Sequence, residues 1–247
     1  MLGRQHLMLS LGTAAAVLPA FLPQHGVEVL VSLLGVGVGS LIPDIDSPDA
    51  AVFHSDLKGL DHGTGRLVND FIGPVLPLFG YLTRYLIYRP SLGLYDHVLL
   101  RGYDFGHGHR AFSHSILGVA TITGLTGFYL LWPVLQLGIG PGYLAVFLAS
   151  YGSGMFLHLF QDSATRSGIA WNSPFSDFMV RGELVTGRSM RRPRLMLYVL
   201  AAISIASLYF SLHATNIPQL TVISGSASLT AGAWVLFMVL GAEAGFS

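Results

Sequence analysis

Seven long apolar segments dominate this chain of 247 residues. They lie at residues 7–22, 27–43, 71–88, 114–135, 141–161, 195–213 and 228–243. A bilayer is spanned by a helix of about 20 apolar residues. Charged residues make up only 11% of the chain, whereas an ordinary soluble domain carries about 25%. The segments therefore predict an integral membrane protein built of helices.

The distribution of basic residues indicates a topology for these segments. Lys and Arg gather in short loops on the cytoplasmic side of membrane proteins. With segment 71–88 set apart and the N-terminus inside, six spans leave outside connections at 23–26, 136–140 and 214–227, and none contains Lys or Arg. All 13 basic residues lie elsewhere. The sequence therefore predicts an all-α polytopic bundle with about six transmembrane helices, forming a single domain over residues 1–247.

Segment 71–88 does not fit this pattern as a further span. Both of its flanks must lie inside for the topology to close, and it contains Pro74, Pro77 and Arg84. We therefore expect a re-entrant or interfacial segment. A full span is the alternative, and it would place the basic residues of 89–113 outside, against the charge pattern.

The first apolar segment has a second interpretation. Arg4 followed by an apolar run and small residues is also typical of a secretory signal peptide. His6 lies within the run, however, and another apolar segment follows almost at once. We therefore expect a retained first helix.

Histidines and aspartates recur at the helix ends that this topology places inside. They are His6 in the first helix, Asp44 and Asp46 after the second, His109 and His114 before the fourth, and His158 and Asp162 ending the fifth. Basic residues and turns fix the topology without these side chains, so their convergence on one face is a partly independent result. His158 and Asp162 are four residues apart and share one face of a helix.

These seven side chains suit a site for divalent metal ions. Ionisable groups within or beside membrane spans are costly and usually functional. Seven ligands are too many for one tetrahedral site but suit two ions about 3.5–4 Å apart. Mixed nitrogen and oxygen ligation favours Zn²⁺, with Mn²⁺ or Fe²⁺ as alternatives. The chain has no cysteine, which excludes thiolate ligands, a cysteine nucleophile and disulfides.

Taken singly, each of these residues also has a structural interpretation. His6 can be an interfacial residue, Asp44 and Asp46 can be polar helix-end residues, and His158 can pair with Asp162 in a structural contact. Their gathering on one face favours the metal site. We expect the histidines of the polar loops and of the opposite face to lie outside it: His25, His54, His62, His97 and His213.

Three further residues are candidates for binding a substrate. Arg110 lies between His109 and His114, so its guanidinium can meet a phosphate held between the ions, or serve only as a positive-inside charge. Asn172 and Ser173 follow the fifth helix, where they can line the mouth of a substrate site.

Four short motifs carry a resemblance to a known family. They are His6, LIPDIDSP at 41–48, HRAFSHS at 109–115 and LHLFQDSATRSG at 157–168. In order and spacing they resemble the YdjM-like family of membrane-bound, metal-dependent hydrolases, which are described as LexA-binding and associated with the inner membrane. Leu157 replaces a serine that is common there, and Arg166 adds a charge. The agreement covers a metal-binding core at 1–175, while the helices of 195–243 match only in being apolar.

The resemblance implies a metal-binding role for seven residues and a hydrolytic activity. The implied ligands are His6, Asp44, Asp46, His109, His114, His158 and Asp162. The chain is also distantly similar to zinc-dependent phospholipase C, but only in its ligand types, and such an analogy does not establish function.

Together these observations predict a hydrolase embedded in the inner (plasma) membrane. Its substrate would be a phosphoester of a lipid or lipid-linked molecule at the cytoplasmic face. The catalytic candidates are Arg110, for the developing charge, and Asp44 or Asp46, as general base. The net charge is zero, so no nucleic-acid partner is expected, and the sequence assigns no oligomeric state.

Three other functions fit parts of the pattern. A metal transporter or sensor needs ligands near the bilayer midplane and a route across. A regulatory membrane protein would keep the metal for structure alone. An intramembrane metallopeptidase would carry an HExxH helix, which this chain lacks.

Overall fold

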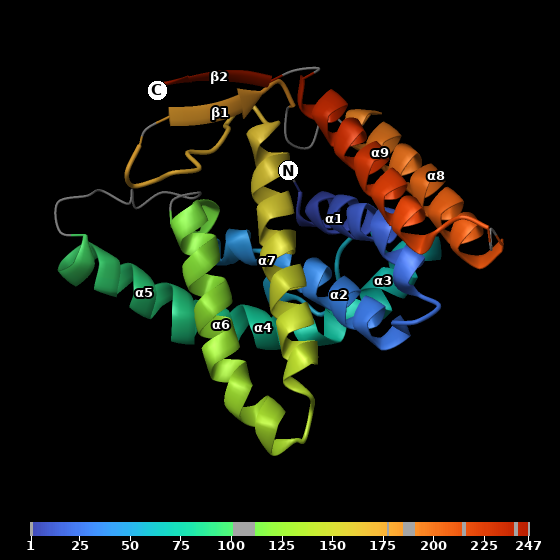
Figure 1. The fold of residues 1–247 in the computed structure, drawn as a ribbon. Coiled ribbons are helices and arrows are strands. Elements are labelled where there is room, and N and C mark those ends of the chain that lie inside the picture. Colours follow the sequence, from blue (N-terminus) through green and yellow to red (C-terminus); the bar gives the residue numbers. More distant parts are fainter. Residues whose placement is uncertain are drawn as a thin grey trace.

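Helices form most of the protein (Figure 1). The computed structural model describes residues 2–100, 112–176, 178–184, 191–213, 216–239 and 242–246. It is 77% helical, and two short strands, β1 (Phe178–Gly182) and β2 (Ala242–Phe246), pair antiparallel. The predicted all-α membrane fold is thus confirmed.

Four helices are long and apolar enough to cross a membrane. They are α6 (Ile116–Gln136), α7 (Pro141–Ser163), α8 (Arg191–His213) and α9 (Gln219–Val239). α6 and α7 form one hairpin, and α8 packs beside α9 in a second pair (Figure 1). They correspond to four of the six predicted spans.

The other two predicted spans are shorter helices. α1 (Gly3–Val17) continues into a 3₁₀ turn, η1 (Leu18–Phe21), and α2 (Gly26–Gly39) has 14 residues. With about 1.5 Å of rise per residue, α2 is about 21 Å long, against a hydrocarbon core of about 30 Å. α1 packs against α8, and α2 packs against α7.

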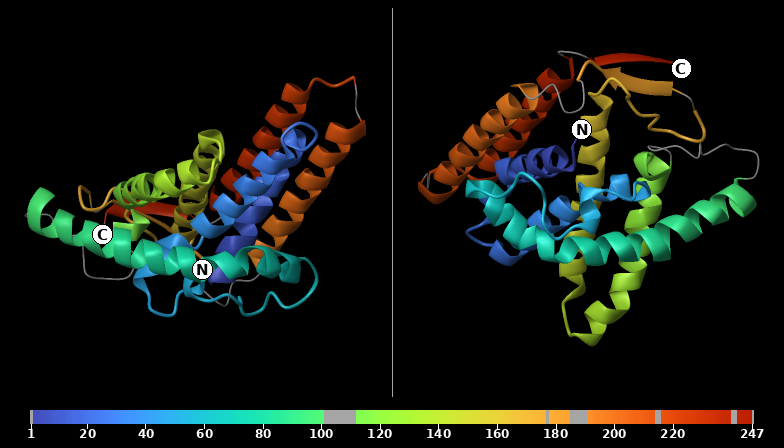
Figure 2. Two further views of the ribbon diagram at one scale, coloured as in Figure 1. Left: turned by 90° about the horizontal axis from the view of Figure 1, so that it is seen from below. Right: turned by 180° about the vertical axis from the view of Figure 1, so that it is seen from behind.

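Residues 63–99 form one continuous helical stretch. Its parts are α3 (Gly63–Ile72), η4 (Gly73–Val75), α4 (Leu76–Leu82), η5 (Thr83–Tyr88), α5 (Arg89–Leu94) and η6 (Tyr95–Leu99). In the left view of Figure 2 it runs along one side of the molecule, and the helical hairpins lie on its other side. The stretch does not turn back on itself, and the interfacial placement of 71–88 stays a prediction.

The middle of this stretch has an apolar outer face and a packed inner face. Its large exposed side chains include Tyr81, Leu82 and Tyr85. On the inner face, a Cβ at Gly80 would lie 2.7 Å from the carbonyl oxygen of Val52, in the 3₁₀ turn η3 (Ala51–Phe53). An amphipathic helix of this kind suits the boundary between water and lipid.

The closest helix contact in the core lies between α2 and α7. A Cβ at Gly39 would meet the carbonyl oxygen of Tyr151 at 2.1 Å, and a Cβ at Gly154 would meet that of Val36 at 2.4 Å. Small residues allow membrane helices to approach in this way. Three further short turns connect or precede the long helices near this contact: η2 (Ile42–Asp46), η3 and η7 (Phe112–His114).

The C-terminal part departs from the prediction in two places. α9 begins at Gln219, although 214–227 was expected to be an outside connection. Two hydroxyls of this polar stretch are satisfied within the helix, because Ser224 Oγ donates to the carbonyl of Thr221 at 3.2 Å and Ser226 Oγ donates to the carbonyl of Ile223 at 3.0 Å. Strand β2 begins at Ala242 and pairs with β1, so the last two residues of the predicted segment 228–243 lie in a strand.

The contact between α2 and α7 gives the first prediction. Gly154→Ala adds a methyl group where the backbone of α2 leaves no room, and overpacking of this kind costs about 1–3 kcal/mol. The thermal unfolding midpoint of the purified protein in detergent should therefore fall. Gly124→Ala in α6 is the matched control, since a Cβ there meets nothing within 4 Å. An equal midpoint for the two variants would contradict the role of this contact.

Candidate metal centre

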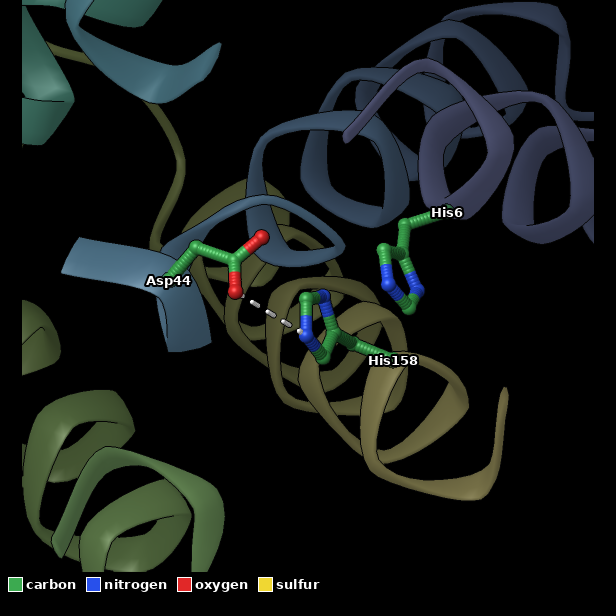
Figure 3. A group of neighbouring side chains, drawn as sticks. All are labelled: His6, Asp44 and His158. Carbon is green, nitrogen blue, oxygen red and sulfur yellow. Dashed lines mark ion pairs between the residues drawn. The ribbon is translucent and has the colours of Figure 1, made fainter. Parts of the chain in front are cut away.

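Five predicted ligands from four segments meet at one place. His6 lies in the first turns of α1, Asp44 in η2, and His114 at the end of η7. His158 and Asp162 lie in the last two turns of α7. Figure 3 shows His6, Asp44 and His158 converging from three separate elements.

Carboxylate oxygens lie close to one nitrogen of each histidine. Asp44 Oδ1 is 3.6 Å from His158 Nε2 and 3.7 Å from His114 Nε2. Asp162 Oδ1 is 3.3 Å from His6 Nε2, and its Oδ2 is 3.7 Å from both His114 Nε2 and His158 Nε2. The rings of His6 and His158 are stacked, with centroids 3.7 Å apart. Three imidazoles thus present the same atom to two carboxylates.

The cluster is closed on most sides and open at Asp44. The side chains of His114, His158 and Asp162 are 0% exposed and that of His6 is 1% exposed, whereas that of Asp44 is 18% exposed. Within the described part of the cluster, Asp44 in η2 is therefore the ligand candidate that solvent reaches.

Hydrogen bonds behind the cluster set the orientation of two imidazoles. His6 Nδ1 donates to Gln161 Oε1 at 2.9 Å, and Gln161 Nε2 donates to Ser10 Oγ at 2.9 Å. His158 Nδ1 donates to the carbonyl of Ser40 at 2.7 Å. Because amide and carbonyl oxygens only accept hydrogen bonds, each Nδ1 carries the proton and each Nε2 presents a lone pair.

The Nε2 atoms of His6 and His158 have the properties of metal ligands. Within the described residues, Nε2 of His6 and Nε2 of His158 are buried and make no hydrogen bond. A buried acceptor without a partner is costly, and a second nitrogen held by a hydrogen bond is typical of metal-ligating histidines. The residues present therefore fit a divalent ion.

The charges of the two ligands outside the long helices agree with this. Burial alone would raise the pKa of Asp44, but the neighbouring His158 and the other two histidines hold it below its ordinary value. Burial lowers the pKa of His114, although Asp44 opposes that shift. An ionised carboxylate and a neutral imidazole are the forms that bind metal ions.

The ligand atoms form two overlapping groups of three. Within each group, the three atoms all lie within 4.8 Å of one another. One consists of His6, Asp44 and His158, and the other of His114, His158 and Asp162. His158 belongs to both. Buried His and Asp groups that can hold a metal ion are thus present.

The remaining predicted site residues lie beside the cluster or outside the described residues. Asp46 is in the same turn as Asp44 but belongs to neither group among the described residues. Its charge acts instead on Tyr88. Burial of Tyr88 and the charge of Asp46 both raise the pKa of the Tyr88 hydroxyl. His109 and Arg110 fall within 101–111, which the structure does not describe. Their roles stay predictions.

Asn172 and Ser173 lie in a turn after α7. The carbonyl of Asn172 accepts hydrogen bonds from the amides of Phe175 and Ser176, so the residue shapes the turn. The neighbouring carbonyl of Trp171 accepts from the amide of Ile116 at 2.9 Å, which holds the turn beside the start of α6. The structure places them near η7, and their binding role stays a prediction.

The sequence analysis did not identify Gln161, Ser10 or Ser40. One signal was present for Gln161, since an amide within the apolar run before Asp162 must find a polar partner when buried. Ser40 acts through its backbone carbonyl, which leaves no trace in the residue type. The histidines expected outside the site and described here, His25, His54, His62, His97 and His213, are exposed.

Loss of His158 should remove bound metal. His158→Gln deletes the imidazole that belongs to both ligand groups, and we expect the metal content of the purified protein to fall from stoichiometric to background. Plasma mass spectrometry of the protein checks this, with size-exclusion chromatography to confirm folding. His62→Gln, at an exposed position, is the control. Stoichiometric metal in His158→Gln would contradict the site.

The orientation of His6 gives a separate prediction. Gln161→Leu removes the acceptor for His6 Nδ1, and loss of such a supporting partner weakens metal binding by about 10–100-fold. Gln161→Glu keeps an acceptor and should bind metal at least as tightly as wild type. Competition with a metallochromic chelator measures both affinities. Ser153→Ala, exposed on the same helix, should not change the affinity, and a wild-type value for Gln161→Leu would refute the role.

Comparison with known proteins identifies the family of this chain. The YdjM inner membrane protein family matches residues 1–243, which includes the last two helices as well as the cluster. No curated protein and no solved structure matches the chain significantly. Because the family match covers nearly the whole sequence, the chain belongs to the YdjM inner membrane protein family.

Proposed function

We propose that the protein is a membrane-embedded, metal-dependent hydrolase that cleaves a phosphoester of a lipid or lipid-linked substrate. The buried cluster of three imidazoles and two carboxylates carries the proposal. A site that only stabilised the fold would be closed on all sides, whereas this one has an opening at Asp44, whose side chain is 18% exposed.

Two ions are proposed, with Zn²⁺ favoured and Mn²⁺ or Fe²⁺ as alternatives. The two ligand groups support this number, because each contains a carboxylate and they overlap only at His158. Asp46 and His109 are proposed as further ligands. Nitrogen and oxygen donors in this mixture suit these metals.

Divalent ions held here would supply Lewis-acid chemistry and activate water near neutral pH. The chain's own residues would then orient the substrate and move protons. Asp44 is the proposed general base, because its carboxylate lies at the open side of the cluster. Arg110 is proposed to stabilise the developing negative charge, and Asn172 and Ser173 to line the substrate mouth.

The proposed location is the cytoplasmic face of the inner membrane, with several membrane crossings. Membership of an inner membrane family supports the membrane. The described turns at 22–25 and 137–140 contain no Lys or Arg. Leu9 and Ala164 lie close in sequence to cluster residues, and they pack with Met196 near the start of α8. The same helix start carries three arginines, Arg191, Arg192 and Arg194. By the positive-inside rule this end faces the cytoplasm.

Hydrolysis assays on the metal-loaded protein test the proposal. Phosphatidic acid, phosphodiester phospholipids and a polyprenyl diphosphate are offered in mixed micelles, and phosphate or headgroup release is measured. Asp44→Asn should lower kcat by about 10²–10⁴-fold, the range for loss of a general base. Asp49→Asn, at an exposed position three residues beyond η2, is the matched control.

The contrary outcomes point to other functions. Equal release by wild type and Asp44→Asn on every substrate would sink the hydrolase proposal. Metal flux into proteoliposomes without any hydrolysis would instead indicate a transporter. Unfolding by chelators, with neither flux nor hydrolysis, would indicate a structural metal in a regulatory protein.

A further inference from the structure

Arg84 lies on the inner side of the long helical stretch. It belongs to η5, between Thr83 and Ile87, which are both buried. Tyr85 and Leu86, its neighbours toward α5, are exposed on the outer face. The side chain of Arg84 is therefore directed into the protein, although the residue is partly exposed.

The guanidinium rests against the turn that carries Asp44. Arg84 Nη1 donates to the carbonyl of Ser47 at 3.4 Å, and its Cζ lies 5.2 Å from the centre of the Phe53 ring. The amide of Ser47 donates to the carbonyl of Asp44 at 2.9 Å. Arg84 is thus held one turn away from Asp44, the cluster residue that is partly exposed.

The guanidinium has hydrogen-bonding capacity that its neighbours do not use. Arg84 Nε is buried and has no hydrogen-bond partner within the described part of the chain, and the carboxylates described there form no ion pair with the guanidinium. An arginine has five N–H donors in a planar fork. A partly buried cation with unused donors is costly unless an anion completes it.

Tyr88 adds a second polar group on the same side. It lies one turn beyond Arg84, close enough to Asp46 and Arg84 for both charges to act on its hydroxyl. Its phenol hydroxyl can donate a hydrogen bond. A cation and a hydroxyl donor therefore lie near Asp46, in the turn that also carries Asp44.

We propose that Arg84 binds the anionic oxygens of the substrate's phosphate group at the mouth of the metal centre. This inference rests on the proposed function, and it names a residue of the long helix as the receptor for that group. The fork of an arginine matches a phosphate through two parallel hydrogen bonds. The apolar outer face around Tyr85 lies on the same helical stretch.

Binding of phosphate ligands to the metal-loaded full chain tests the inference. Calorimetry with inorganic phosphate forms one arm, and binding to phosphatidylcholine nanodiscs with and without phosphatidic acid forms the other. Arg84→Gln should weaken both affinities by about 10–100-fold, as expected for loss of a charge-assisted pair. Arg84→Lys keeps the charge without the fork and should fall between. Metal content should be unchanged in both variants.

Arg89→Gln is the matched control. Arg89 lies five residues along the same stretch, but its guanidinium rests over the Tyr85 ring, with Cζ 4.8 Å from the ring centre, on the outer face. Its loss should leave the affinity for inorganic phosphate as in wild type. An equal fall for Arg89→Gln would show a diffuse charge effect and overturn the assignment.

Other outcomes separate this inference from the proposed function. Wild-type phosphate affinity in Arg84→Gln, with hydrolysis intact, overturns the inference and leaves the hydrolase standing. Arg84-dependent phosphate binding without hydrolysis of any substrate supports the inference and refutes the hydrolase. A loss confined to phosphatidic acid assigns the phosphate to a lipid, and an equal loss in both arms assigns recognition to the phosphate itself. If Arg84→Gln does not fold, unchanged affinity in Arg84→Lys overturns the inference, and a several-fold loss supports it.

Discussion

The close approach of α2 and α7 is the contact on which the site depends. Gly39 and Gly154 let backbone meet backbone, where any side chain would separate the helices. That approach brings the carbonyl of Ser40, at the end of α2, within 2.7 Å of His158 Nδ1. The next residues of the chain form η2, so the same contact also places Asp44 over His158. The packing of α2 against α7 thus also sets the orientation of the ligands. A change in the spacing of these helices would displace both Ser40 and Asp44 relative to His158.

Electrostatics explain why such a cluster needs an occupant. Two carboxylates and three imidazoles lie together, with four of the five side chains almost completely buried. Buried charges are tolerated when they are paired or bind metal ions. The hydrogen bonds from Nδ1 of His6 and His158 commit the protons of these rings away from the carboxylates. In the proposed function, divalent ions balance the negative charge, and Arg84 adds a positive charge at the mouth for the substrate.

Much of this arrangement was predictable, and the remainder has identifiable physical causes. Apolar segments and the positions of Lys and Arg predicted the helices and the gathering of His6, Asp44, His114, His158 and Asp162. They did not predict the polar start of α9, where Ser226 satisfies its hydroxyl within the helix. Ser40 was missed because its backbone carbonyl carries the interaction, and Gln161 because its partners are far away in the sequence. In the sequence, Arg84 indicates only that segment 71–88 is not a span. Its contact with Ser47 joins residues that are 37 positions apart, and the local pattern does not predict it.

The distance along the chain between His6 and Gln161, which is 155 residues, has a consequence for biosynthesis. Domains and helices emerge from the ribosome in order, from the N-terminus. α1 is made first, yet the partner that orients its histidine and the carboxylate that faces it both come from the end of α7. The surroundings of His6 are therefore complete only after α7 has been synthesised. Assembly of the His/Asp cluster is thus a late step in biosynthesis, because it requires that α1 has packed against the end of α7.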